Sequence, residues 1–108
     1  MGSGFAFVVQ GFQVISANKM IIEQDNTSMG VNYDPGTYRD VTWGDRDRDI
    51  WRIRAGWQET DLVILSVAQN LRVLERYRLV QRNRMQVRIE VQADGVKREL
   101  TRFFDRKK

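Results

Sequence analysis

The clearest pattern in the chain is an alternation of apolar and polar residues with a period of two. Residues 84–92 keep it without a break: Met85, Val87, Ile89 and Val91 alternate with Arg84, Gln86, Arg88, Glu90 and Gln92. Successive side chains of a β-strand point to opposite faces, so this period predicts a strand with one face buried and the other in water. Residues 51–57 follow the same pattern. Residues 71–79 follow it too, apart from Glu75, an acid on the apolar face.

Short polar segments divide the chain into pieces of strand length. They lie at 24–28, 33–37, 43–49, 68–70, 80–84 and 93–95. The last contains Asp94-Gly95, a typical hairpin turn, because both central positions of the favoured two-residue turn need positive φ. Weaker strands are predicted at 20–22 and 29–33. Together these features predict one all-β domain over residues 1–108, an antiparallel meander of eight or nine short strands that forms a barrel or a curled sheet.

Residues 60–80 fit two descriptions. Six of their apolar residues and one alanine also fall on a single helical stripe, with Thr60 or Asp61 as the helix cap. The β-branched residues Val63, Ile64 and Val67 favour strand instead, and Asn70 would lie in the middle of the helix. We therefore predict two strands separated near Gln69-Asn70.

The composition excludes several kinds of chemistry. The chain of 108 residues has no cysteine and no histidine. It therefore forms no disulfide and lacks the imidazole that is the commonest general base and metal ligand. A chain of this length buries a core without such cross-links. Residues 4–16 are apolar but too few to span a bilayer, which takes about 20 residues, so no transmembrane segment is predicted. The opening MGSG (1–4) is typical of an expression tag.

The order of motifs in residues 51–107 carries a family resemblance. A strand with two tryptophans is followed by LVI, then ERY, then the alternating strand, and finally an aromatic-Asp-Arg close. In this order the chain resembles the second half of small lipocalin-like β domains in bacterial envelope proteins, and residues 20–36 resemble their first hairpin. The resemblance implies a lipocalin-like architecture and a location in the periplasm or cell envelope. It implies no catalytic residue.

Carboxylates are the main candidates for metal binding or acid–base chemistry. The DRDRD run (45–49) spaces three acids as a calcium loop begins, but such a loop needs glycine at position six and glutamate at position twelve, where this chain has Ile50 and Gly56. We interpret the run as a self-neutralised, solvated loop that binds no metal. Glu75 is the one acid placed to be buried, and its simplest role is to pair with a neighbouring arginine or to lie near a strand end where water reaches it. No serine has a catalytic base, so we predict no enzyme, no catalytic residue and no cofactor.

The aromatic residues allow two interpretations. Trp43, Trp51, Trp57 and Tyr77 would line a pocket for a small apolar ligand if a barrel closed around a cavity. Alternatively they fill the core, which we favour because the interior of a small barrel is only just wide enough for its own side chains.

Basic residues concentrate in the last third of the chain. Residues 72–108 carry 12 basic and 5 acidic side chains, whereas residues 1–71 carry 6 and 9. Five arginines are predicted on the solvent faces of two adjacent strands: Arg72, Arg76, Arg78, Arg84 and Arg88. Such a face would hold an anionic partner, namely nucleic acid, anionic lipid or an acidic protein. Binding of single strands usually adds exposed aromatic residues, which these faces lack, so we favour a solvated face over a binding face.

The apolar N-terminal segment is predicted to be a central strand, a barrel-closing strand or a strand donated to a partner, and the last of these would give self-association. Residues 5–15 carry no charge and have high β-propensity, so an exposed strand there would invite pairing with another chain. The residues expected to make this contact are Phe5, Phe7, Val9 and Phe12. We therefore predict a non-enzymatic envelope domain that acts by binding or assembly as a homo-oligomer. The alternatives are a module for an anionic partner and a carrier of a small apolar ligand.

Overall fold

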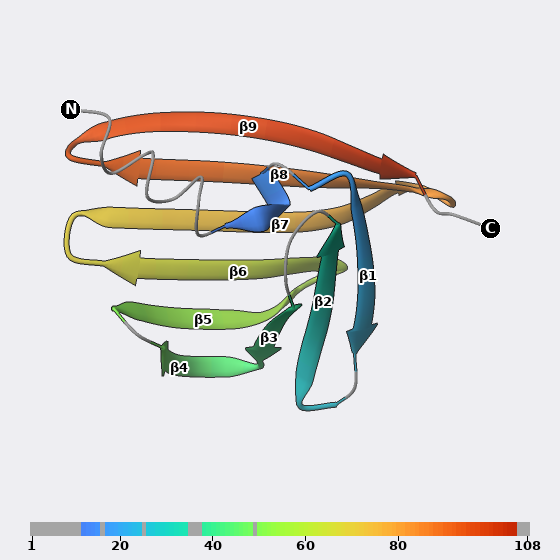
Figure 1. Cartoon of the computed structure of the whole chain (residues 1–108), viewed down its shortest axis with the longest axis horizontal. Coiled ribbons are helices and arrows are strands. Elements are labelled where there is room, and N and C mark those ends of the chain that lie inside the picture. The colour runs from blue at the N-terminus through green and yellow to red at the C-terminus, as the bar shows by residue number, and fades with distance from the viewer. Residues whose placement is uncertain (1–11, 16, 25, 35–37, 49, 106–108) are drawn as a thin grey trace.

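The computed structural model describes residues 12–15, 17–24, 26–34, 38–48 and 50–105. These residues form nine strands and one short 3-10 helix (Figure 1). The elements are η1 (Gln13–Ile15), β1 (Lys19–Gln24), β2 (Ser28–Asp34), β3 (Tyr38–Thr42), β4 (Gly44–Arg48), β5 (Trp51–Gln58), β6 (Asp61–Ala68), β7 (Leu71–Gln81), β8 (Arg84–Ala93) and β9 (Val96–Asp105).

The strands form two antiparallel sheets in the order of the sequence. One sheet has the order β1-β2-β3, and the other has the order β4-β5-β6-β7-β8-β9. β1 and β2 lie across the long strands of the six-stranded sheet (Figure 1). The prediction of an all-β antiparallel meander of eight or nine strands is confirmed. Of the two predicted forms, the structure agrees with the curled sheet, since the sheets do not close into a barrel.

Residues 60–80 form two strands, as predicted, and no helix. β6 and β7 pair over Leu62↔Tyr77 to Ala68↔Leu71, with the turn at Gln69-Asn70. Gln69 has a φ of 32°, which lets the chain reverse in two residues. The predicted Asp94-Gly95 turn is also present, with φ values of 52° and 80°.

The DRDRD run was predicted to be a loop, and this prediction is wrong. Its first four residues lie in β4, an edge strand paired with β5. Asp45 lies opposite Arg54, and Asp47 lies opposite Arg52. These pairs compensate the charges across the two strands, so the run is self-neutralised as expected but extended.

The strand predicted over residues 5–15 is wrong at its end, because Gln13–Ile15 form the 3-10 helix η1. A hydrogen bond from the Ile15 amide to the Phe12 carbonyl closes this turn at 3.1 Å. Arg102 of β9 holds the segment by donating hydrogen bonds to the carbonyls of Val14 (3.0 Å) and Ala17 (2.6 Å). Phe5, Phe7 and Val9 lie outside the described residues.

The core lies between the two sheets. The three-stranded sheet contributes Met29, Val31, Tyr33 and Val41, and η1 and its flanks contribute Phe12, Val14 and Ala17. The six-stranded sheet contributes one face only, with alternate residues buried: Ala55, Leu62, Ile64, Val73, Tyr77, Val87, Ile89 and Val91. The other face of the six-stranded sheet therefore takes no part in this core.

Candidate functional site: the open face of the six-stranded sheet

We call the second face of the six-stranded sheet the open face. It carries the side chains of β4–β9 that alternate with the core residues, and it lies on the side away from the three-stranded sheet. An antiparallel sheet often has one face packed and one face in water. The strand pattern leaves the open face uncovered in the described part of the chain, so it is the main candidate for contact with a partner.

Four apolar residues form a strip in the middle of the open face. Leu65 of β6 lies directly opposite Leu74 of β7, and Val63 and Val67 flank Leu65 along β6. Val67 is 37% exposed, and the other three are half-buried although no second layer of strands covers them. Register places arginines around this strip, with Arg54 opposite Leu65 on one side and Arg76 opposite Val63 on the other.

The five arginines predicted to form a basic face all lie on the open face. Arg72, Arg76 and Arg78 come from β7, and Arg84 and Arg88 come from β8, where Arg76 lies directly opposite Arg88. Most of them have acidic partners, however. Arg84 pairs with Asp105 at 2.9 Å, and Arg88 pairs with Glu99 at 3.3 Å. Arg72 is exposed and makes no ion pair within the described residues.

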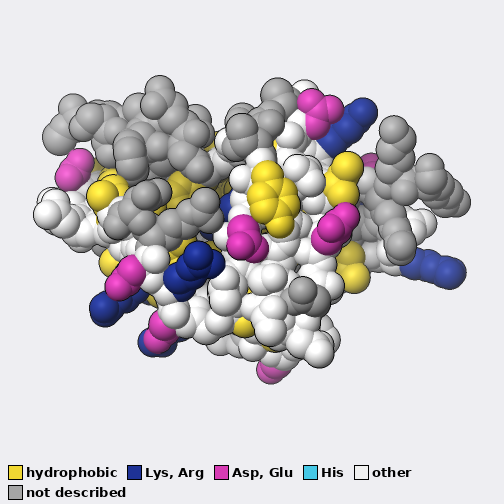
Figure 2. Space-filling view, turned by 60° about the horizontal axis from the view of Figure 1, so that its bottom comes forward, with side chains coloured by type: hydrophobic (Ala, Val, Ile, Leu, Met, Phe, Trp, Pro, Cys, Tyr) yellow, Lys and Arg dark blue, Asp and Glu magenta, His cyan; other side chains and the backbone are white. Residues whose placement is uncertain are grey.

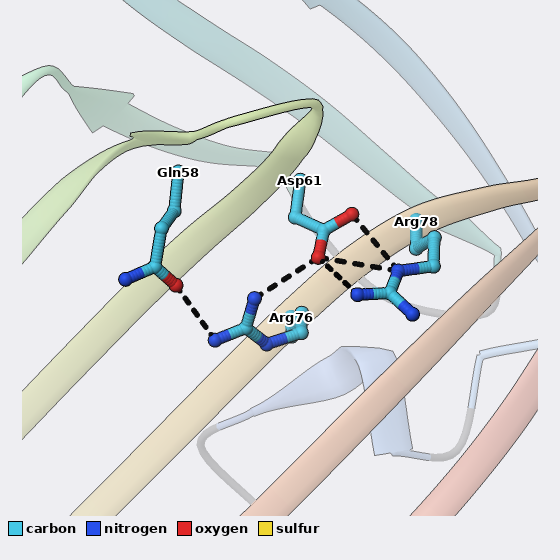
Figure 3. Close-up of polar contacts among 4 residues, drawn as sticks. All are labelled: Gln58, Asp61, Arg76 and Arg78. Carbon is cyan, nitrogen blue, oxygen red and sulfur yellow. Dashed lines mark hydrogen bonds and ion pairs between the residues drawn. The ribbon is translucent and has the colours of Figure 1, made fainter.

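Arg76 and Arg78 share one carboxylate, that of Asp61 (Figure 3). Asp61 begins β6, and its side chain is only 6% exposed. Arg76 Nη1 donates to Asp61 Oδ2 at 2.9 Å, and Arg78 Nη2 donates to the same oxygen at 2.7 Å. Gln58 Oε1 accepts the second Arg76 hydrogen bond at 2.8 Å. Hydrogen bonds from Arg78 and Arg76 lower the pKa of Asp61 to about 2.

The shared carboxylate predicts a pH-dependent contribution to stability. Because the folded pKa of Asp61 is about 2 and the unfolded value is near 3.9, its contribution is complete above pH ~4 and is lost as the pH falls through ~2. We expect Asp61→Asn to lower the free energy of unfolding at pH 5–7 and to approach the unmodified protein near pH 2. Urea unfolding at several pH values measures this. Gln58→Ala is the matched control, since it removes an uncharged contact to Arg76. A difference between Asp61→Asn and the unmodified protein that stays constant over this range would contradict the expectation.

Charges of both signs are mixed over the open face. It carries eight basic side chains and six acidic ones in the described residues, a net charge of +2. The basic residues are Arg52, Arg54, Arg72, Arg76, Arg78, Arg84, Arg88 and Lys97, and the acidic residues are Asp45, Asp47, Asp61, Glu90, Glu99 and Asp105. A different view of the molecule likewise shows basic and acidic side chains side by side, with hydrophobic side chains between them (Figure 2).

The positive excess is local and lies on β7. Asp45 pairs with Arg54 at 2.7 Å, and Lys97 bridges the opposed acids Glu90 (3.0 Å) and Glu99 (4.0 Å). The hydrogen bond from Lys97 is the main reason that the pKa of Glu90 is lowered. β7, in contrast, has three arginines against the single carboxylate of Asp61. The excess positive charge therefore lies next to the apolar strip.

The four aromatic residues predicted to line one pocket are not brought together. Trp43 and Trp57 contact each other with ring centroids 6.3 Å apart, and Trp57 is 56% exposed. Trp51 packs edge-on against Phe12 at 5.2 Å. Tyr77 is buried, and its hydroxyl donates to Glu75 Oε1 at 2.7 Å. In the described residues the four side chains therefore make three different contacts, with Trp51 on Phe12, Trp43 on Trp57 and Tyr77 on Glu75.

Glu75 lies at the centre of a buried polar group between the sheets. Its side chain is fully buried, and Arg39 of β3 binds it through two hydrogen bonds: Nη1 to Oε1 at 2.8 Å and Nη2 to Oε2 at 3.0 Å. The ring of Phe12 lies 5.3 Å from the guanidinium of Arg39. The interpretation of Glu75 as an acid paired with an arginine is confirmed, although its partner lies in the other sheet.

The buried environment shifts the pKa values of Arg39, Tyr77 and Tyr33. Burial opposes the charge of Arg39, but the Glu75 carboxylate outweighs it and raises the pKa of the guanidinium. Burial and the nearby Glu75 charge raise the pKa of Tyr77 well above its usual value. Burial likewise raises the pKa of Tyr33. We interpret the group as a structural link between the two sheets rather than as a catalytic site.

Neither a metal site nor a membrane-spanning helix is found in the described part of the chain. It holds no group of three or more acidic side chains placed to bind a metal ion. None of its helices has the length and apolar character needed to cross a bilayer.

Comparisons of the chain with protein-family models, with curated proteins and with solved structures gave no match. The resemblance to lipocalin-like envelope domains therefore stays a prediction.

Proposed function

We propose that the protein is a non-enzymatic binding domain that docks another protein on its open face. One observation carries this proposal: an apolar strip lies on an uncovered sheet face between two rows of arginines, with the excess positive charge beside it. Protein interfaces commonly have an apolar centre with a polar rim, and arginine is enriched in them. The expected partner therefore has an apolar centre and an acidic rim.

The charge balance favours a protein over nucleic acid. A nucleic-acid surface contacts many phosphates and needs a field of one sign. On the open face, cross-strand acids already bind Arg54, Arg84 and Arg88. Arg72, Arg76 and Arg78 with one acid provide a small charge excess, enough to orient a partner and to select an acidic one.

Binding of a random copolymer of glutamate and tyrosine tests the docking proposal, because this polymer supplies both acidic and apolar aromatic groups. We expect binding at low salt, measured by fluorescence anisotropy with a labelled polymer. Arg72→Glu should weaken it at least about tenfold, since it reverses the one open-face arginine on β7 that has no acidic partner in the described residues.

The matched control is Arg46→Glu, the same charge change on the other face of the sheet, which should leave the affinity unchanged. Arg46 is exposed and contacts Thr42 Oγ1 at 2.6 Å. Equal losses in the two variants would show non-specific charge attraction and overturn the proposal. So would tighter binding of single-stranded DNA than of the copolymer, or no binding of the copolymer at all.

A further inference from the structure

β9 is an edge strand of the six-stranded sheet among the described strands. It pairs with β8 in unbroken register from Ala93↔Val96 to Arg84↔Asp105, and no described strand lies on its other side (Figure 1). An edge strand offers a row of N–H and C=O groups to another chain, and proteins commonly block it with proline, a bulge or a short length. β9 has ten residues, no proline and no break in register. Its apolar side chains Val96, Leu100 and Phe103 are 50%, 40% and 54% exposed.

We propose that β9 pairs antiparallel with β9 of a second copy, around a twofold axis at Thr101. Homodimers are usually closed by a twofold axis, so the interface residues must be complementary to themselves. An axis perpendicular to the sheet keeps the two open faces on the same side. With the axis at Thr101, residues 97–105 of one copy pair with residues 105–97 of the other.

This register places no like charges opposite each other. Lys97 lies opposite Asp105 of the second copy, Arg98 opposite Phe104, Glu99 opposite Phe103, and Leu100 opposite Arg102, while Thr101 faces Thr101 at the axis. Each pair occurs twice except the central one. Opposite charges and threonine pairs facing across strands stabilise a sheet, and an aromatic ring is a suitable neighbour for arginine. Lys97 and Arg98, the charges that would otherwise guard this edge, are thus both accommodated.

Neighbouring registers are less favourable. An axis at Leu100 places Arg98 opposite Arg102 on both sides of the axis. Axes at Arg98, Glu99 and Arg102 each place a charged residue opposite itself, which destabilises the pair. An axis at Phe103 avoids this but pairs only residues 101–105. Thr101 is therefore the centre that combines full-length pairing with charge complementarity.

Dimerisation through β9 is a second property of the protein, and it does not depend on the proposed docking at the open face. It would join the two six-stranded sheets and place two open faces side by side, so a partner with repeated acidic sites would bind both. Failure of the copolymer experiment would leave the dimer untouched, because β9 pairing uses backbone groups at the edge.

The first test is the mass of the full chain by light scattering from about 1 μM to about 1 mM, a range that covers weak dimers. We expect a concentration-dependent approach to the mass of a dimer. Lys97→Asp should weaken dimerisation at least about tenfold, because it places two acids opposite each other, and Lys97→Asp with Asp105→Lys should restore it. Asp47→Lys on β4, the other edge of the same sheet, is the control and should not change the mass. A monomer at all concentrations, or equal weakening by Asp47→Lys, would overturn the dimer through β9.

The second test reads the register directly, since the chain has no natural cysteine. Thr101→Cys places two thiols opposite each other within disulfide distance. Glu99→Cys on the same face places them four residues apart along the strands, roughly 14 Å, which is too far. Under mild oxidation we expect Thr101→Cys to form a disulfide-linked dimer and Glu99→Cys to form no cross-link. Faster cross-linking of Glu99→Cys, or none of Thr101→Cys in a chain that dimerises, would overturn the register.

Discussion

Replacing Arg39 with methionine is expected to lower the free energy of unfolding by about 3–5 kcal/mol. The substitution leaves the Glu75 carboxylate fully buried with Tyr77 as its one remaining side-chain donor in the described residues. Removing one partner from a buried ion pair costs this much because the remaining charge has lost both water and its counter-ion. Methionine retains much of the volume of arginine, so the loss measures the charge rather than a cavity. Urea unfolding at pH 7 gives the value.

Two companion variants separate the ion pair from general disruption. Arg52→Met removes an arginine that pairs with Asp47 and whose side chain is 79% exposed. It should change the free energy of unfolding by less than about 0.5 kcal/mol. Arg39→Met with Glu75→Leu replaces the whole buried pair by apolar groups. It should be more stable than Arg39→Met alone by at least about 2 kcal/mol, since no buried charge remains. If the double variant is no more stable than Arg39→Met, the buried charge is not the cause of the loss.

The strands could be predicted largely from the sequence because burial on one face leaves a visible period. β5, β7 and β8 all alternate, and the β-branched residues of β6 decided between strand and helix. β4 was missed because its residues are all charged or glycine, so no apolar face marks it. It is extended because it pairs with β5, where Arg54 and Arg52 lie opposite Asp45 and Asp47, and such partners are known only once the strands are placed.

The sequence predicted which arginines lie on the candidate site but not which acidic residues neutralise them. The alternation placed the five arginines correctly on one face. It did not reveal Asp61, because an acid at the first residue of a strand gives no signal that two arginines from the next strand will cover it. Glu75 did give a signal, an acid among apolar neighbours, and this indicated either an arginine partner or a strand end in water. Arg39 itself lies 36 residues away in the other sheet, a contact that only the packing of the two sheets creates.

Ile89→Ala should lower the free energy of unfolding strongly, because Ile89 lies in the centre of the core. Ile89 is fully buried and lies opposite Glu75 on β7 and Leu100 on β9. Truncating such a residue removes apolar contacts and leaves a cavity, at a cost of about 2–5 kcal/mol. Thermal or urea unfolding would show the loss as a shifted midpoint with an unchanged slope.

Leu79→Ala is the matched comparison, because Leu79 lies on the same face of the sheet but is 73% exposed. It is opposite Met85 near the end of β7, beyond the area that the three-stranded sheet and η1 cover. We expect a change within about 0.5 kcal/mol. Similar losses from the two variants would mean that a further layer covers the end of β7 in solution. A large difference would instead agree with a small sheet that covers only part of the core face and leaves the end of β7 exposed.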